Sequence, residues 1–130
     1  MTGQILKPVT PENMEKLMLK ILKVLVQEEA NMMVNFYVNG KHYATDQSPG
    51  FIPHSLPDGT LYYEDPSPCD VTKQIEYNNP KTITMTFEGP MYHDINYRSN
   101  RIGQAIDRLA APYGLFSELG FAWSLALYEI

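Results

Sequence analysis

The stretch MMVNFYVNGKHYAT, residues 32–45, decides the fold because its pattern is that of two strands joined by a two-residue turn. Asn39-Gly40 supplies the positive φ angles of a type I′ turn, the strongest short-range signal of a β-hairpin. This loop length places Tyr37 opposite His42, with Val38 opposite Lys41 and Phe36 opposite Tyr43. We therefore predict a hairpin from strands at 32–38 and 41–45, whose core face carries Val34, Phe36, Val38 and Tyr43.

A third strand is predicted at 81–88, where Ile83, Met85 and Phe87 alternate with three threonines. A period of two gives one buried face and one face that is wet or paired with something polar. Gly89-Pro90 then ends the strand and starts a helix that runs to about residue 111. Glu88 is placed to cap an amide of its first turn.

The sequence predicts a helix before the hairpin and a strand at the C-terminal end of the chain. Thr10-Pro11-Glu12 starts a helix that runs to about Glu29, and it is apolar around most of its circumference. Such a helix has to be covered on several sides, either by its own domain or by another chain. At the other end, alternation from Gly120 onward favours a C-terminal strand, although the same residues also suit a helical period.

The resulting order is α-β-β-(β)-β-α-β in a single domain of 130 residues. This order predicts an α+β two-layer sandwich, with a largely antiparallel sheet of four or five strands and two long helices on one face. No internal repeat or linker divides the chain, so residues 1–130 are assigned to one domain.

The excess negative charge lies in one proline-rich segment at about 46–80. It contains six acids against one base, Lys73, while the whole chain has a net charge of −5. Prolines exclude a continuous helix or central strand there, so we expect a long loop. The loop either keeps the protein in solution, or covers a site or docks a basic partner.

Composition excludes several classes of protein. The single cysteine, Cys69, excludes a disulfide scaffold, and no apolar run approaches the length of a membrane span. An acidic chain makes nucleic-acid binding unlikely, because phosphate backbones require clustered Lys and Arg. We expect a cytoplasmic protein without a metal or another cofactor, and no catalytic signature is present.

Candidate binding residues come from the aromatic and charged patterns. The Tyr62-Tyr63 pair in the acidic loop either recognises a partner or pins the loop to the core. His93-Asp94 near a helix start is the best seed for a metal site, although we expect no metal, and Asp94 is four residues from Arg98, the spacing of a favourable ion pair. The predicted binding residues are Tyr37, His42, Tyr62, Tyr63, Tyr92, His93, Asp94, Arg98 and Arg101.

Two functions are compatible with these residues. The first is a non-catalytic domain that binds a protein partner, or associates with itself as a homodimer, through its first helix. The alternative is a small-molecule-binding protein or enzyme whose pocket lies between the sheet and the central loop and uses His42, His93 and the tyrosines.

Overall fold

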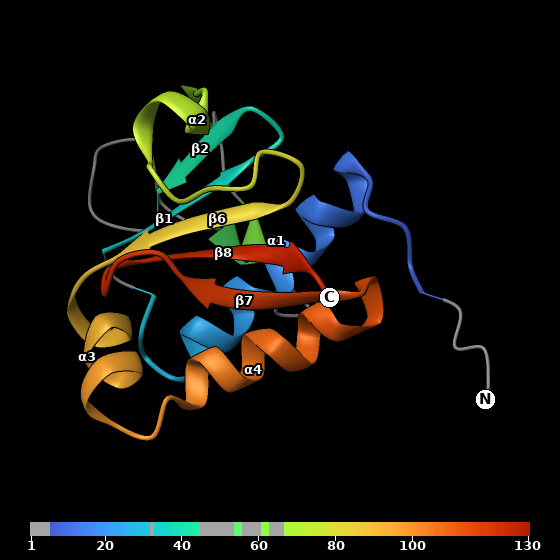
Figure 1. Ribbon diagram of the computed structural model, residues 1–130. Helices are drawn as coiled ribbons and strands as arrows, with labels where there is room; N and C mark the ends of the chain where they lie inside the picture. Colours follow the sequence, from blue (N-terminus) through green and yellow to red (C-terminus); the bar gives the residue numbers. More distant parts are fainter. Residues whose placement is uncertain (1–5, 32, 45–53, 56–60, 63–66) are drawn as a thin grey trace.

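The computed structural model describes residues 6–31, 33–44, 54–55, 61–62 and 67–130, and it has the predicted α+β architecture (Figure 1). An antiparallel sheet has the strand order β2-β1-β6-β8-β7, and the two-residue β5 extends it beyond β2. The main strands are β1 (Val34–Val38), β2 (Lys41–Ala44), β6 (Ile83–Phe87), β7 (Leu115–Leu119) and β8 (Ser124–Glu129). The helices are α1 (Pro11–Gln27), α2 (Val71–Gln74), α3 (Gly89–Tyr97) and α4 (Arg101–Ala110).

The predicted hairpin is confirmed in its register and in its core face. Tyr37 pairs with His42 and Val38 with Lys41, across a turn in which Asn39 and Gly40 both have positive φ. The apolar side chains assigned to the core face are all buried, as expected for Val34, Phe36, Val38 and Tyr43.

Strand β6 is the centre of the sheet and is buried on both faces. Its apolar residues enter the main core, and its threonines point to the opposite face. The Asn79 N–H donates to Thr84 Oγ1 at 3.0 Å, and Asn35 Nδ2 donates to Thr86 Oγ1 at 3.2 Å. The threonine face of β6 is therefore paired with polar groups and is not the water-exposed face that was the other alternative.

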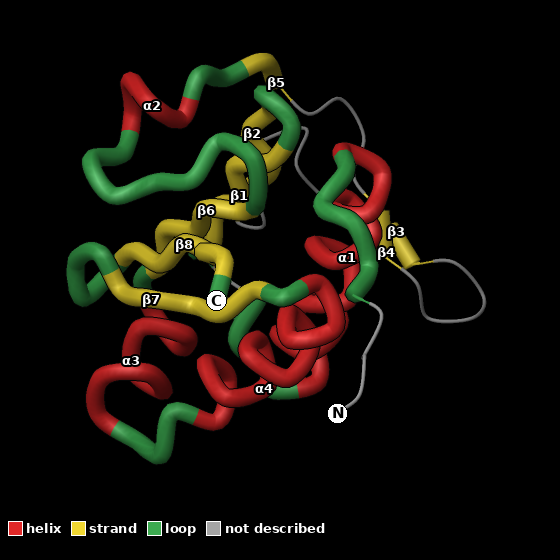
Figure 2. Tube along the Cα trace, turned by 45° about the vertical axis from the view of Figure 1, so that its right-hand side comes forward, coloured by secondary structure: helices red, strands yellow, loops and turns green. Residues whose placement is uncertain are grey.

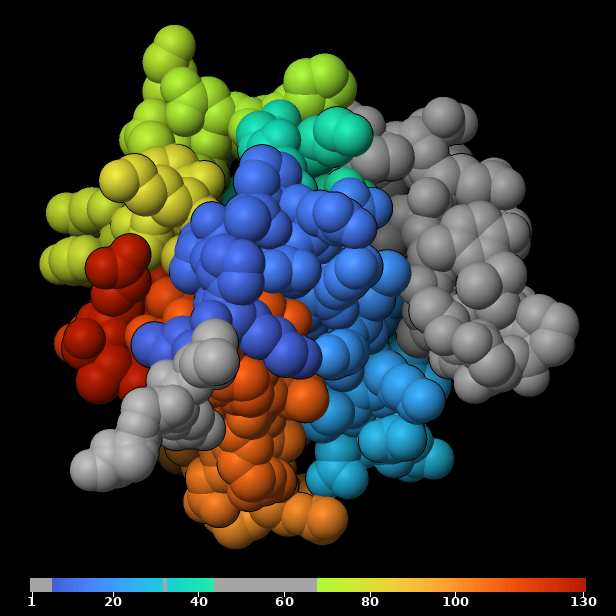
Figure 3. Space-filling view, turned by 90° about the vertical axis from the view of Figure 1, so that its right-hand side faces the viewer, coloured from blue at the N-terminus to red at the C-terminus, as the bar shows by residue number. Residues whose placement is uncertain are grey.

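Helices α1 and α4 lie side by side over one face of the sheet (Figure 3). Met14, Leu17, Met18, Ile21, Leu22 and Leu25 of α1 are completely buried. The domain itself thus covers most of the apolar surface of α1. Among the described residues of this helix, Val26 is the one large apolar side chain that is exposed. The feature that suggested self-association through the first helix is accounted for within one chain.

The second long helix is broken, contrary to the prediction of one helix up to residue 111. Helix α3 ends at Tyr97 and α4 begins at Arg101, because Asn100 has left-handed backbone angles of φ 56° and ψ 42°. The Asn100 N–H donates to the Asp94 carbonyl oxygen at 3.2 Å, which closes the chain into a tight corner between the two helices.

The C-terminal region forms a hairpin, of which the sequence indicated only the second strand. The last element is a strand, as favoured, but it begins at Ser124, and residues 120–123 form the turn from β7. Leu125 and Leu127 are buried in the core, whereas Phe121 and Trp123 lie in the turn.

The central segment is partly described. It contains a two-stranded sheet, β3 (His54–Ser55) with β4 (Leu61–Tyr62), and the short β5 (Ser67–Pro68) at the edge of the main sheet. The Asp70 carboxylate caps α2 by accepting from the Thr72 N–H, and it also accepts from the Thr72 hydroxyl. The hydrogen bonds with the hydroxyl and the N–H of Thr72 lower the pKa of Asp70. Helix α2 and the chain after it lie on the sheet face away from α1 (Figure 2). None of the described helices has the length and apolar character needed to cross a membrane.

Candidate functional site

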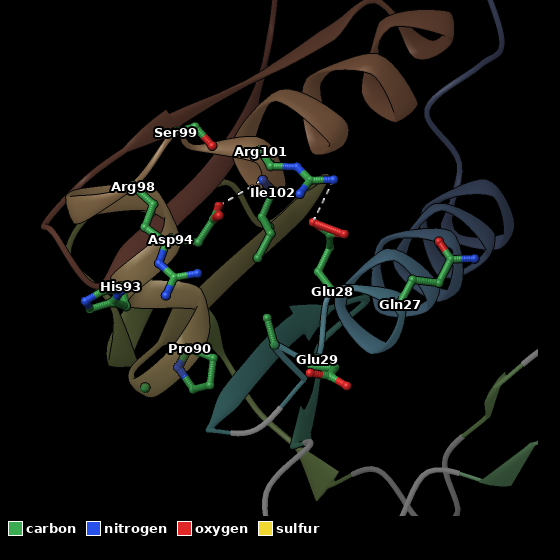
Figure 4. Close-up of a pocket in the computed structure, with 12 residues that line it drawn as sticks. Gln27, Glu28, Glu29, Pro90, His93, Asp94, Arg98, Ser99, Arg101 and Ile102 are labelled. Carbon is green, nitrogen blue, oxygen red and sulfur yellow. Dashed lines mark hydrogen bonds and ion pairs between the residues drawn. The ribbon is translucent and has the colours of Figure 1, made fainter.

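Four of the predicted binding residues come together in a cleft between the C-terminal end of α1, helix α3 and the start of α4 (Figure 4). The cleft has a volume of about 800 Å³. The predicted residues that line it are His93, Asp94, Arg98 and Arg101. Glu28 and Glu29, directly after α1, line it as well. We call this region the helical cleft.

Asp94 has a structural role in the helical cleft. Its Oδ2 accepts from the Ile102 N–H at 3.0 Å and thereby caps α4 from the preceding helix. Asn100, the residue at the N-cap position, makes no side-chain cap. The ion pair expected between Asp94 and Arg98 does not form, because Arg98 ends α3 with an extended backbone and leaves the helical face.

The charges of the helical cleft partly neutralise one another. An Arg101 nitrogen lies 3.5 Å from Glu28 Oε1, but the arginine side chain is 71% exposed, so this pair adds little stability. Carboxylates and guanidinium groups face the same space, and no described group of three or more His, Cys, Asp or Glu side chains is arranged to hold a metal ion. The helical cleft is suited to a small polar molecule that carries charge.

Tyr92 lies on α3 beside the helical cleft, and its ring centre is 6.0 Å from that of Tyr97. A side-chain hydrogen bond with Tyr97 raises the pKa of Tyr92. The His93 ring also contacts Tyr97, at 5.6 Å between ring centres. The rings of Tyr92, His93 and Tyr97 thus lie together on α3 and its C-terminal end.

Tyr37 and His42 lie elsewhere, on the β1–β2 hairpin. Their rings stack at 4.9 Å with an interplanar angle of 9°, and His42 Nε2 is 2.7 Å from Asn35 Oδ1. Desolvation, partly offset by a hydrogen bond with Thr86, raises the pKa of Tyr37. Tyr37 also lines a cavity of about 410 Å³ against Cys69 and Val71, which is the described space between the sheet and the central segment.

His42 and His93 therefore do not share a site, since β2 and α3 lie at opposite ends of the molecule (Figure 1). The proposed pairing of these two histidines in one pocket has no counterpart among the described residues. Tyr62 belongs to β4, and Tyr63 lies outside the described residues, so the role suggested for this pair in recognition stays a prediction.

The sequence did not indicate a group of exposed aromatic side chains where the β7–β8 turn meets the chain after α2. The Phe121 ring stacks on Trp123 at 4.9 Å and 13°, and it meets Tyr77 edge-on at 5.1 Å. Tyr77 is 46% exposed and Trp123 42% exposed. We call Tyr77, Phe121 and Trp123 the aromatic surface.

Gly120 makes this arrangement possible. A Cβ atom at this position would lie 2.5 Å from Tyr77 Cβ, so only glycine allows the tyrosine to approach the turn so closely. Helix α3 supports the turn from below, because Asn96 Nδ2 donates to the Ala122 carbonyl oxygen at 2.8 Å. The aromatic surface is thus held by two contacts of the turn, that of Gly120 with Tyr77 and that of the Ala122 carbonyl with Asn96.

Comparison with known proteins found no matching family model, no matching curated protein and no matching solved structure.

Proposed function

We propose that this domain is a non-catalytic module that binds a protein partner through the aromatic surface. The observation that carries the proposal is the stacked group of Tyr77, Phe121 and Trp123, which remains substantially exposed although its rings contact one another. Rigid aromatic side chains supply large contact area at a low entropic cost, and Trp and Tyr dominate the energetics of protein interfaces.

The surrounding charges support a basic partner. The exposed Glu76 precedes Tyr77 in the chain, and the exposed Glu88 lines the same cavity as Trp123. The chain has a net charge of −5. Like charges oppose the pairing of two such surfaces, so a partner with a positive surface is favoured over a second copy. The same acids disfavour a phosphate backbone, although aromatic rings also stack on nucleic-acid bases.

Selection from a random peptide library displayed on phage tests this proposal. We expect the wild-type protein to enrich peptides whose affinity falls at least about tenfold with Trp123→Ala or Tyr77→Ala, the loss typical of an aromatic hot spot. Tyr97→Ala is the matched control, because Tyr97 is 68% exposed but lies on α3, outside the aromatic surface. If the selected peptides bind Trp123→Ala as tightly as the wild type, the aromatic surface is not the docking site.

Sedimentation over a wide concentration range tests the choice between a foreign partner and self-association. We expect a monomer, because the apolar face of α1 is buried and the aromatic surface carries acids. A dimer that is weakened by Trp123→Ala would assign the surface to a second copy of the chain. A dimer that is weakened by Val26→Ala and not by Trp123→Ala would assign self-association to α1.

A second candidate function is the binding of a small anionic molecule in the helical cleft. The favouring observation is that Arg98 and Arg101 line the same cavity of about 800 Å³, whereas the sheet-to-loop pocket expected from the sequence is half that volume, at about 410 Å³. Citrate and inorganic phosphate are suitable probes. Thermal stabilisation by either probe that disappears in Arg98→Ala would support this function, and no stabilisation would exclude it for these anions.

A further inference from the structure

A second, smaller cleft opens where three neighbouring strands end, at the side of the aromatic surface. It has a volume of about 330 Å³ and is lined by Met33 before β1, Glu88 after β6 and Trp123 before β8. Ile75, from the chain after α2, forms a further wall. We call it the strand-end cleft.

Main-chain hydrogen bonds fix the positions of these residues. The Phe87 N–H donates to the Trp123 carbonyl oxygen at 2.9 Å, and the Glu88 N–H donates to the Met33 carbonyl oxygen at 3.0 Å. The three side chains therefore start from adjacent, paired backbone positions and surround one opening. A site built on strand ends in this way is largely preformed, so a ligand pays little entropy to order it.

The Glu88 carboxylate is available to a ligand. The sequence predicted that Glu88 caps the first turn of α3, but the structure shows no side-chain cap at this position. Glu88 is exposed, and among the described residues its carboxylate has no ion-pair or hydrogen-bond partner. No Lys, Arg or His side chain lines the strand-end cleft, so its charge is not neutralised from within.

Trp123 supplies the second element of recognition. One face of its indole is covered by Phe121, while 42% of the residue remains exposed and it lines the strand-end cleft. An indole ring attracts a cation placed over its face, and arginine is the cation most often found there. Met33 and Ile75 add apolar surface that matches the methylene stem of a long side chain.

We infer that the strand-end cleft binds an arginine side chain of the partner, with its guanidinium between the Glu88 carboxylate and the Trp123 indole. This inference rests on the proposed function and names the chemistry of the partner at one point of contact. Arginine fits better than lysine, because its planar guanidinium both stacks on an aromatic ring and donates in parallel to a carboxylate.

Trp123 is the single tryptophan of the chain, so its fluorescence reports binding at this cleft directly. The probes are the peptide acetyl-Ala-Leu-Arg-Leu-Ala-amide and the same peptide with citrulline, which keeps the shape of arginine but has no charge. We expect a saturable change in emission with the arginine peptide and an affinity about tenfold lower for the citrulline peptide, as for loss of a partly desolvated cation–π contact and ion pair.

Glu88→Gln should lower the affinity for the arginine peptide part of the way towards that of the citrulline peptide, because the ion pair is lost while the cation–π contact with Trp123 remains. Glu118→Gln is the matched control: it removes an exposed acid of β7 that does not line the strand-end cleft, and it should leave the affinity within about twofold of the wild type. Circular dichroism of both variants checks that the fold is retained, and the citrulline comparison on the wild-type protein does not depend on any variant.

Three results would overturn the inference: no saturable response to the arginine peptide, equal affinity for the citrulline peptide, or unchanged binding by Glu88→Gln. The peptide selection described above separates this failure from that of the proposed function. Selected peptides that depend on Trp123 but contain no arginine would leave the protein-binding function standing and remove the arginine from it.

Discussion

Asp94→Ala should destabilise the protein by about 1.5 kcal/mol, because Asp94 is the cap that allows α4 to begin. The variant removes a 3.0 Å hydrogen bond to the partly buried Ile102 N–H, and Asn100 does not replace it. Loss of a capping side chain costs about 0.5–2 kcal/mol, and hydrogen bonds to charged groups contribute about 1.5–3 kcal/mol. The upper half of the capping range applies, since the acceptor is a carboxylate and the donor is shielded from water.

Asp94→Asn separates the hydrogen bond from the charge. An asparagine side chain also accepts from helix N-terminal amides, so this variant should lose less than half as much stability as Asp94→Ala. Glu76→Ala is the control for removal of an exposed acid without a cap, and its effect should stay within about 0.5 kcal/mol.

Urea unfolding followed by Trp123 fluorescence and by circular dichroism measures these changes. In thermal unfolding of a domain of this size, a loss of about 1.5 kcal/mol corresponds to a decrease in Tm of roughly 6 °C. If Asp94→Ala has the stability of the wild type, or if Asp94→Asn is equally destabilised, then Asp94 does not cap α4 and its place in the helical cleft needs a functional explanation.

Three further outcomes are expected. Gly120→Ala should lower the free energy of unfolding by about 1–3 kcal/mol and shift the fluorescence emission of Trp123, because the new methyl group collides with Tyr77 Cβ. Unchanged emission in a fully stable variant would contradict this packing. Asp107→Ala should lower the urea midpoint and promote concentration-dependent association. The Ser117 N–H and hydroxyl both donate to Asp107 Oδ1 at 2.7 Å, so the variant leaves these groups free on the edge strand β7. A monodisperse variant of wild-type stability would refute this expectation. From neutral pH up to about pH 10 the contribution of the tyrosines to stability should be constant, and above that pH it should fall, because burial holds the pKa of three tyrosines above 10.0 and the folded state disfavours their ionisation; a pH-independent free energy of unfolding across the phenolate titration would oppose this. These tyrosines are Tyr37, Tyr43 and Tyr128.

Elements determined by local chemistry were predictable from the sequence. The Asn39-Gly40 turn fixes its own register, and Thr10 accepts from the Asn13 N–H at 3.1 Å as the start of α1 requires. The burial of alternate residues in β1 follows from its period, and the period of β6 places its apolar residues on the core face. In each case the residues that decide the structure are adjacent in the chain.

The helix break and strand β7 were not predictable, because distant residues determine them. The corner before α4 contains no proline or glycine, and its cap comes from Asp94 in the preceding helix. Strand β7 has no β-branched residue, and most of its residues are not buried, so its pattern is weak until β8 pairs with it.

The site residues divide in the same way. His93, Asp94, Arg98 and Arg101 lie within one short stretch, and the fold gathers them in the helical cleft. The aromatic surface joins Tyr77 to a turn more than forty positions further along the chain, and only the path of the segment after α2 brings these rings together. Such a long-range contact leaves no periodic signal in a single sequence.

The position of β6 determines the order in which the protein can be assembled. Each of its neighbours belongs to a hairpin closed by a short connection: β1 with β2, and β8 with β7. Strand β6 joins these two locally formed units, and its partner β8 follows all the other described strands in chain order. During synthesis on the ribosome the sheet therefore stays incomplete until β8 has emerged from the exit tunnel. Because β6 is buried on both faces and paired on both edges, its backbone amides should be among the slowest to exchange in the native state.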